Sequence, residues 1–240
     1  MSAPWRCLSE ICLGCERDTL KFAGLTIVTG HYGAGKTNFS VNAALDIASS
    51  GEKCTIIDLD IVNPYFRTAD FGELFAGKGI ELLSPVYANT NLDIPSLNIP
   101  LDSILAAGGH VVIDVGGDDE GAKALGRYSE IIRSFADREM LYVINRYRYL
   151  TKEAADAAVL MREIEVSSQL NCTGIVNNSS LGVETAADTV RESLAFADEV
   201  SKLTGLPIRA TCAVEGCMPE EAPEPYTVKR YVRNLWEGKI

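Results

Sequence analysis

The sequence predicts a doubly wound α/β fold, with a mainly parallel sheet and helices on both of its faces. Short apolar runs rich in β-branched residues alternate with longer amphipathic segments along most of the chain, an order typical of consecutive strand–helix units. Most of the runs are continuously apolar, which indicates strands covered on both faces. The expected strands are residues 25–29, 54–58, 80–84, 110–115, 140–145, 172–177 and 207–211.

Helices are expected between these strands, where apolar residues recur every three or four positions. In residues 36–50, Phe39, Ala43 and Ile47 fall on one stripe of such a helix. The other expected helices cover residues 121–137, 151–168 and 184–204. Because this alternation continues without a clear linker, we expect one domain over residues 24–240. Residues 1–23 form a cysteine-containing appendage, and the proline-rich stretch 215–226 is expected to be irregular.

Composition and charge limit the functions that the chain can have. Of its 240 residues, 47% are hydrophobic and 23% are charged, which is ordinary for a globular protein. The formal net charge of -11 disfavours binding to polyanions, so we expect no nucleic-acid partner. No apolar run approaches the roughly 18 residues of a membrane span. The N-terminal residues lack the apolar segment of a signal peptide, so a cytoplasmic location is expected.

Residues 30–37, GHYGAGKT, match the G-x-x-x-x-G-K-[ST] pattern of a phosphate-binding loop. Glycines let backbone N–H groups converge on phosphate oxygens, and the following helix presents its positive end to the same anion. We expect Lys36 to act catalytically by neutralising the β- and γ-phosphates, and the Thr37 hydroxyl to bind Mg²⁺. The residues expected to contact the nucleotide here are Gly30, Gly33, Ala34, Gly35, Lys36, Thr37 and Asn38.

Two further strands end in carboxylates. Residues 110–115 carry Asp114 near their end, where we expect a carboxylate that holds Mg²⁺. Gly117 follows, and its backbone N–H is expected to contact the γ-phosphate. The strand at 54–58 ends in Asp58 and is followed by Asp60, at the sheet edge where ligands of open α/β sheets bind. We expect Asp58 to lie nearer the metal and Asp60 to orient the attacking water.

Together these three motifs resemble the MinD/ParA/Mrp group of P-loop ATPases, whose domain is also called the CobQ/CobB/MinD/ParA nucleotide-binding domain. The resemblance covers roughly residues 24–212. It implies ATP and Mg²⁺ as cofactors, slow ATP hydrolysis, a switch that acts on a protein or metal cargo, and a homodimer that closes on ATP. In this group an Asn after a late strand holds the adenine, and both Asn177 and Asn178 are candidates here.

One position departs from that group. Its phosphate loop carries an extra lysine that reaches the partner's nucleotide, whereas this chain has His31 there, followed by Tyr32. Histidine is a weaker cation whose charge depends on pH. The loop is equally similar to relatives that lack this lysine, such as dethiobiotin synthetase, which transfer the phosphoryl group to a small molecule. A nucleotide-dependent regulator that seldom hydrolyses its ligand is a further alternative.

The appendage carries Cys7, Cys12 and Cys15 with the spacing C-x4-C-x2-C. This spacing matches three of the four ligand positions of plant-type ferredoxins, and thiolates so spaced can also hold zinc. A fourth ligand would come from Cys212, from Cys217 or from a second subunit. The alternative is that these cysteines are reduced thiols that bind no metal.

Two basic segments suggest contacts with partners. Residues 226–240 predict a basic amphipathic helix, which either tethers the protein to a membrane surface or packs on its own domain. Its apolar stripe consists of Val228, Tyr231, Val232, Leu235 and Trp236. Residues 145–150, NRYRYL, combine arginines with aromatic residues, and we expect them to dock a partner or to lie at the edge of the nucleotide site.

Overall fold

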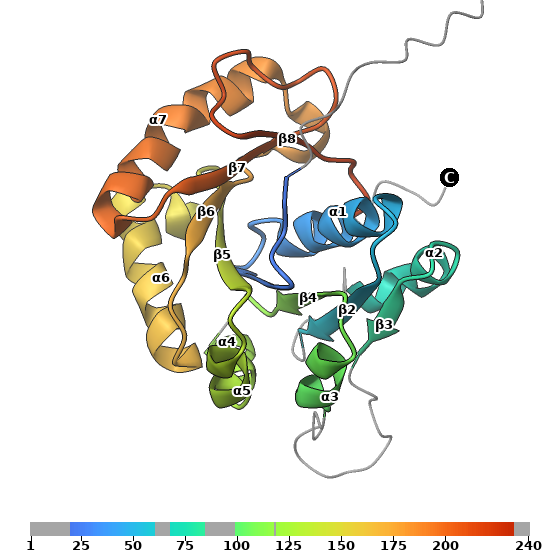
Figure 1. The fold of residues 1–240 in the computed structure, drawn as a ribbon. Helices are drawn as coiled ribbons and strands as arrows, with labels where there is room; N and C mark the ends of the chain where they lie inside the picture. Colours follow the sequence, from blue (N-terminus) through green and yellow to red (C-terminus); the bar gives the residue numbers. More distant parts are fainter. Residues whose placement is uncertain (1–19, 61–67, 85–98, 118, 233–240) are drawn as a thin grey trace, which may run out of the picture.

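The computed structural model describes residues 20–60, 68–84, 99–117 and 119–232. In this part of the chain, parallel strands form one sheet in the order β3-β2-β4-β1-β5-β6-β7-β8 (Figure 1). The strands are β1 (Leu25–Gly30), β2 (Cys54–Leu59), β3 (Glu81–Leu83), β4 (His110–Val115), β5 (Arg138–Ile144), β6 (Gly174–Asn177), β7 (Ile208–Ala213) and β8 (Pro225–Thr227). The helices are α1 (Lys36–Ser49), α2 (Gly72–Ala76), α3 (Leu101–Ala106), α4 (Asp119–Gly126), α5 (Ser129–Ser134), α6 (Ala154–Ser168) and α7 (Ala187–Thr204).

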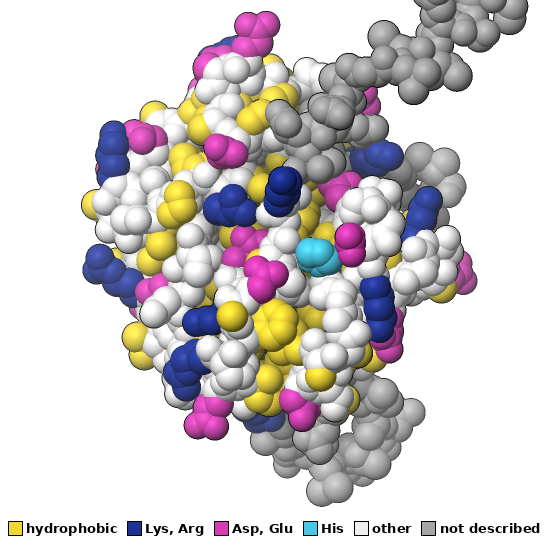
Figure 2. Space-filling model, viewed as in Figure 1, with side chains coloured by type: hydrophobic (Ala, Val, Ile, Leu, Met, Phe, Trp, Pro, Cys, Tyr) yellow, Lys and Arg dark blue, Asp and Glu magenta, His cyan; other side chains and the backbone are white. Residues whose placement is uncertain are grey.

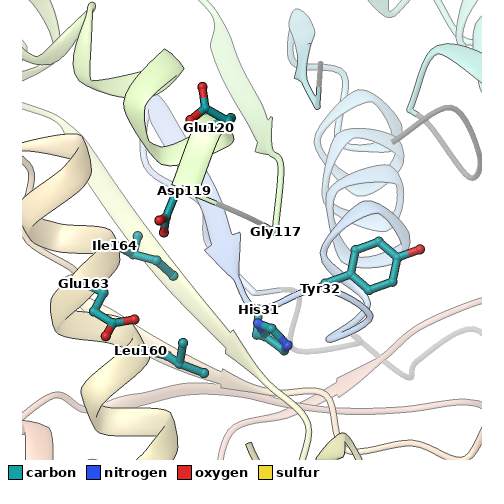
Figure 3. A pocket seen from close by; sticks show the side chains of 8 residues that line it. All are labelled: His31, Tyr32, Gly117, Asp119, Glu120, Leu160, Glu163 and Ile164. Carbon is teal, nitrogen blue, oxygen red and sulfur yellow. The ribbon is translucent and has the colours of Figure 1, made fainter. Parts of the chain in front are cut away.

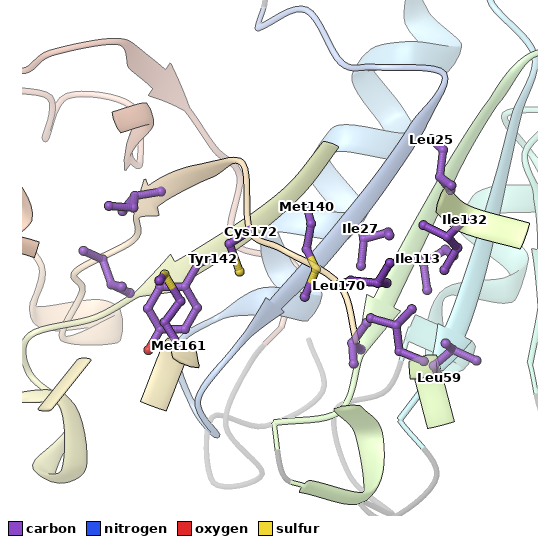
Figure 4. Packing of buried hydrophobic residues seen from close by; sticks show 14 of the residues in the cluster. Leu25, Ile27, Leu59, Ile113, Ile132, Met140, Tyr142, Met161, Leu170 and Cys172 are labelled. Atoms are coloured by element: carbon purple, nitrogen blue, oxygen red, sulfur yellow. The ribbon is translucent and has the colours of Figure 1, made fainter. Parts of the chain in front are cut away.

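Helices cover both faces of the sheet, which confirms the predicted fold class. One apolar cluster contains Ile27 of β1 together with side chains of α3 to α7, and Figure 4 shows it packed between strands and helices. The other cluster contains the next residue, Val28, together with side chains of α1 and α2. Successive residues of a strand point to opposite faces, so a strand between two helical layers must be apolar at nearly every position.

The order of the strands places a crevice beside β1. From β1 the chain passes through α1 to β2 on one side, whereas β5 and the later strands lie on the other side. β1 itself pairs with β4 and with β5. Ligands of open α/β sheets bind at the carboxyl ends of strands where the winding reverses in this way. The loops that follow β1, β4 and β5 therefore surround the expected binding site.

Each predicted strand is present, with its ends shifted by a few residues, but one predicted helix is divided. The sequence predicted a single helix over 121–137, whereas the structure has α4 and α5 with a break after Gly126. A Cβ atom at Gly126 would lie 3.0 Å from the backbone oxygen of Ser167 in α6. The close packing of α6 thus requires glycine at a position where glycine also weakens a helix.

The irregular stretch predicted over 215–226 ends in a strand that the sequence did not reveal. β8 has three residues and begins with proline, which is tolerated at the edge of a sheet because it needs no backbone donor there. Its middle residue, Tyr226, is buried, and its hydroxyl donates a hydrogen bond to Asp46 of α1 at 2.6 Å. One buried aromatic residue therefore anchors a strand too short for a periodic pattern.

The basic amphipathic helix predicted for residues 226–240 is wrong over residues 226–232. Residues 226 and 227 belong to β8, and residues 228–232 have no regular secondary structure; the Val228 N–H donates to the Ala213 oxygen at 2.9 Å. Asn42 of α1 accepts from the Lys229 N–H and donates to the Lys229 oxygen, each at 2.8 Å. Side chains of α1 satisfy these backbone groups, so helix formation is not needed to pair them. Leu235 and Trp236 lie outside the described residues.

The described surface mixes charges of both signs. On the face shown in Figure 2, Lys and Arg side chains are scattered among Asp and Glu side chains and exposed apolar groups. None of the described helices is long and apolar enough to cross a bilayer.

Candidate functional site

Three glycines shape the loop between β1 and α1. Gly30, Gly33 and Gly35 have φ angles of 145°, 74° and 90°, which side chains with a Cβ atom rarely adopt. A Cβ atom at Gly30 would lie 2.4 Å from the backbone oxygen of Val143 in β5. At Gly35 it would lie 2.1 Å from the Asn178 amide nitrogen. The loop therefore needs glycine both for its backbone conformation and for its contacts with β5 and with the turn after β6.

Lys36 is the first residue of α1 and lies between two loops. Its side chain is 7% exposed, and Nζ donates to the His31 oxygen at 3.2 Å. A Cβ atom at Gly117, in the turn after β4, would lie 2.7 Å from Nζ. The N-cap of α1 is Gly35, and the first turn contains no acidic residue. No side chain therefore caps the amino end of α1, whose positive dipole favours an anion.

Asp114, at the end of β4, binds three hydroxyl groups. It accepts hydrogen bonds from Thr37 at 2.8 Å, from Ser40 at 3.2 Å and from Thr68 at 2.7 Å. Burial raises the pKa of Asp114, and these hydroxyls together with Lys36 oppose that rise because they stabilise the carboxylate. The structure thus brings the carboxylate and the Thr37 hydroxyl into direct contact, as expected for a pair that shares one cation.

Asp58 lies opposite Asp114 in the register of β2 and β4. It accepts the backbone N–H groups of Asp60 at 2.9 Å and Ala69 at 3.1 Å. Burial, and secondarily the charge of Asp114, raise the pKa of Asp58 to about 7. Asp60 is half-buried just beyond the strand end. Asp58 is thus paired with Asp114 in the sheet, and the placing of Asp58 nearer the metal and Asp60 at the attacking water remains a prediction.

The donor set around Thr37 fits Mg²⁺. The buried Asp114 carboxylate contacts the Thr37 hydroxyl, and the buried Asp58 lies opposite Asp114 in the sheet. Mg²⁺ prefers such oxygen ligands. Within residues 20–60, 68–84, 99–117 and 119–232, no three His, Cys, Asp or Glu side chains are grouped closely enough to hold a metal ion. A cation at Thr37 would therefore take further ligands from water and phosphate, as Mg²⁺ in nucleotide sites usually does.

The raised pKa of Asp58 predicts a pH-dependent stability in the absence of Mg²⁺ and nucleotide. The pKa of Asp58 is about 7 in the folded state and 3.8 in the unfolded state, so the folded state binds the proton more tightly. The stability that this proton contributes is therefore complete below pH 3.8. The contribution is lost as the pH rises through about 7. In EDTA, we expect the free energy of unfolding to fall between pH 5 and pH 8, with a share on the order of a few kcal/mol from Asp58.

Urea unfolding of the wild type and of Asp58→Asn measures this share, because asparagine stays neutral throughout the range. The variant should lose less stability than the wild type over the same pH interval. Asp156→Asn, an exposed change on α6, is the control and should keep the wild-type slope. An identical slope in Asp58→Asn would contradict the prediction.

The structure separates the two asparagines that the sequence could not distinguish. The Asn178 amide donates to the Ala34 oxygen of the phosphate loop at 2.8 Å. The Asn177 amide instead donates to Ser193 of α7 at 2.9 Å, and its oxygen accepts from the Ser179 hydroxyl. Asn178 therefore faces the phosphate loop, and Asn177 joins β6 to α7. Contact of either residue with a base remains a prediction.

Asn38 is occupied by the C-terminal segment. Its side-chain oxygen accepts the backbone N–H of Tyr231 at 2.8 Å, and its amide donates to the Lys229 oxygen at 3.1 Å. The side chain therefore points to this segment, and the backbone of Asn38 stays in the first turn of α1.

A cavity of about 470 Å³ opens beside the loop (Figure 3). It is bounded by the phosphate loop, by the turn after β4 and by α4 and α6. The His31 imidazole lies on the side of the loop nearer Leu160, whereas the Tyr32 ring points away. Burial, and then the charge of Lys36, lower the pKa of His31, which favours the neutral imidazole. Whether His31 takes the part of the signature lysine remains a prediction. The lining residues are His31, Tyr32, Gly117, Asp119, Glu120, Leu160, Glu163 and Ile164.

Three residues of the site were missed from the sequence or noted only loosely. Ser40 lies one helical turn after Thr37, and this spacing alone indicates that the two share a face. No local signal predicts Thr68, which is brought to Asp114 by the path of the chain after β2. Arg148 belongs to the aromatic and basic stretch 145–150, and its Nε donates to the Gly33 oxygen at 2.7 Å.

The predicted metal site of the appendage falls on Cys7, Cys12 and Cys15, outside the described residues. Of its proposed fourth ligands, Cys212 is buried, and burial raises the pKa of its thiol. Cys217 is half-buried, and its thiol donates to the Thr185 oxygen at 3.4 Å. Iron–sulfur or zinc binding by the appendage remains a prediction.

Comparison with known proteins shows the fold. No family model and no curated protein matches the chain. FtsY from Mycoplasma mycoides is similar with a TM-score of 0.55 and 18% identity, over 79% of this chain and 61% of that one. FtsY from Thermotoga maritima is similar with a TM-score of 0.51 and 18% identity, over 80% and 61%. The signal recognition particle 54 kDa protein from Aeropyrum pernix, in complex with GDP, has a TM-score of 0.51 and 16% identity, over 81% and 42%.

This chain therefore spans between 42% and 61% of the length of these three proteins. The eight-stranded parallel sheet and these similarities agree. The chain has the fold of P-loop NTPases.

Proposed function

We propose that the protein is an Mg²⁺-dependent nucleoside triphosphatase that acts as a switch on a protein or metal cargo. One observation carries the proposal. The Thr37 hydroxyl contacts the Asp114 carboxylate at 2.8 Å, at the start of the helix that follows a loop with three left-handed glycines. Lys36 begins the same helix and lies against Gly117. A loop of amides, a buried ammonium and a hydroxyl–carboxylate pair are the groups that phosphoryl transfer requires.

Each residue has a distinct part in the proposed reaction. The amides of the loop and the Lys36 ammonium bind the phosphates, and Thr37, Asp114 and Asp58 hold the metal. When bound, Mg²⁺ neutralises charge that develops on the phosphoryl oxygens. Asp60, which lies farther out than Asp58, orients the attacking water. The Gly117 amide meets the terminal phosphate and moves once that phosphate leaves, which makes the turn after β4 the switch.

ATP is the proposed nucleotide. A guanine-binding N/TKxD sequence places an aspartate three residues after its first residue, whereas residues 177–180 read NNSS. Because the Asn178 amide donates to the Ala34 oxygen, its side chain links the turn after β6, where a base would lie, to the phosphate loop. The similar protein from Aeropyrum pernix was crystallised with GDP, so the test includes GTP as a competitor.

A second candidate function is phosphoryl transfer to a small molecule. The cavity of about 470 Å³ favours it, because this space is lined by Gly117, whose amide is proposed to meet the terminal phosphate. A pocket of this size accepts a small-molecule acceptor. The two functions differ in one respect: the transferase forms ADP only when its acceptor is present.

Phosphate release from ATP and from GTP, with Mg²⁺ and with EDTA, tests the proposal. We expect Mg²⁺-dependent release from ATP without any added acceptor. Asp60→Ala should still bind ATP but lower the turnover number by about 10²- to 10³-fold, because the water loses its base. Asp156→Ala, on the exposed face of α6, is the control and should match the wild type.

Nucleotide binding without phosphate release would contradict the hydrolase. If ADP then forms only after a pool of metabolites is added, the transferase is correct. Sedimentation with and without ATP tests the proposed homodimer, which should form only with the triphosphate.

A further inference from the structure

Arg148 contacts the phosphate loop from outside the motif. It lies in the turn after β5, and its Nε donates to the Gly33 oxygen at 2.7 Å. A Cβ atom at Gly33 would lie 3.2 Å from Nε and 3.3 Å from the central carbon of the guanidinium. The planar guanidinium therefore lies directly against the apex of the loop. Its remaining N–H groups form a fork that is suited to phosphate oxygens.

The turn that carries Arg148 is firmly built. The oxygen of the buried Asn145 side chain accepts the N–H groups of Tyr147 and Ser180, and its amide donates to the Ser180 oxygen. The Arg148 N–H donates to the Asn145 backbone oxygen at 3.2 Å. These bonds connect the turn after β5 to the turn after β6. The backbone at Arg148 is therefore held by bonds to the ends of two neighbouring strands of the sheet.

The neighbouring arginine serves a different purpose. The Arg146 guanidinium donates to the Glu192 oxygen of α7 and lies 5.8 Å from the centre of the Tyr147 ring. Within one short turn, Arg146 is thus bonded to α7, whereas Arg148 is bonded to the phosphate loop. The turn therefore contains its own control for an experiment on Arg148.

We propose that Arg148 is a positioning residue of the phosphate loop, which holds the Gly33 carbonyl and adds a permanent positive charge to the loop beside that of Lys36. The proposal rests on the proposed function, since it assigns Arg148 to the same nucleoside triphosphate. A charge at this place favours a triphosphate over a diphosphate, because the triphosphate carries more negative charge. The arginine supplies this charge from within the same chain, through its contact with the Gly33 oxygen.

Three variants separate the charge from the hydrogen bond. Arg148→Lys keeps the charge, Arg148→Gln keeps a neutral donor for Gly33, and Arg148→Ala removes both. We expect Gln and Ala to lower kcat/KM for Mg·ATP by about 10- to 100-fold, the range for loss of a charged hydrogen-bond partner. Lys should stay within about threefold of the wild type. Calorimetry with ATP and ADP should show that Gln weakens ATP binding more than ADP binding.

Arg146→Gln is the matched control and should leave kcat/KM and both affinities unchanged. Thermal unfolding of every variant shows whether the fold is intact. The proposal is overturned if Arg148→Gln matches the wild type, if Arg148→Gln weakens ATP and ADP binding equally, or if Arg146→Gln has the same effect. A wild type that binds no nucleotide would contradict the proposed function. A wild type that hydrolyses ATP while Arg148→Gln is unaffected would contradict only the role of Arg148.

Discussion

Replacing Lys36 with alanine is expected to lower kcat/KM for Mg·ATP by at least about 10²- to 10³-fold, the effect of removing one preorganised charge-stabilising donor. The Lys36 ammonium is held between the His31 oxygen and the turn that contains Gly117. It is 7% exposed, so water replaces it poorly. Steady-state phosphate release and calorimetry with ATP measure the loss.

The fold should survive this change. Asp114 keeps its hydrogen bonds to Thr37, Ser40 and Thr68, so the carboxylate at the end of β4 stays bonded to α1 without the ammonium. Lys78→Ala, which removes an exposed lysine near the C-terminal end of α2, is the control and should change neither binding nor turnover. If Lys36→Ala retains Mg²⁺-dependent turnover at the wild-type rate, the assignment of this loop to the phosphates is wrong.

Gly30→Ala is expected to cause the largest loss of stability. The φ angle of Gly30 is 145°, and an added Cβ atom would lie 2.4 Å from the Val143 oxygen. That oxygen belongs to the backbone of β5, which pairs with β1 and cannot yield as a flexible side chain would. Backbone strain costs about 1–3 kcal/mol. With the overlap added, we expect a total of roughly 3–5 kcal/mol, the range of severe core changes.

Gly51→Ala distinguishes the two causes. Gly51 also has a positive φ angle, 86°, but nothing lies within 4 Å of the position of its Cβ atom. This control should therefore lose only the cost of the backbone conformation, about 1–2 kcal/mol. Urea unfolding of both variants gives the difference. Equal losses would show that β5 does not constrain the start of the phosphate loop.

Much of the sheet was predictable because burial on both faces leaves a strong local signal. Residues 110–115 are almost entirely apolar up to Asp114, and the structure has β4 over the same residues. β8 gave no such signal, because its three residues are held by the buried Tyr226. The C-terminal stripe that begins at Val228 has helical spacing, but this segment is not helical, and the Asn42 side chain bonds both backbone groups of Lys229. A periodic pattern shows which side chains are apolar. It does not show which groups form the hydrogen bonds of the backbone.

In the candidate site, too, some residues could be predicted from the sequence and others could not. The phosphate loop was visible because one short stretch contains both its glycines and its lysine. The choice between Asn177 and Asn178 was not visible, since Asn177 ends β6 and Asn178 begins the following turn, and the sequence does not say which side chain faces the loop. Only the packing of α7 against β6 shows that Asn177 bonds Ser193.

By itself, the sequence determined the identity and order of the chemical groups: the glycine loop, its lysine, and the carboxylates that follow two later strands. The glycine loop and its lysine can be recognised from their spacing, because a turn and the helix after it are formed by consecutive residues. Only the tertiary structure decided which distant groups meet. Thr68 reaches Asp114 and Arg148 reaches Gly33 because strand order and register bring them together. Those long-range choices are made by the packing of the whole sheet, which no short stretch of the chain encodes.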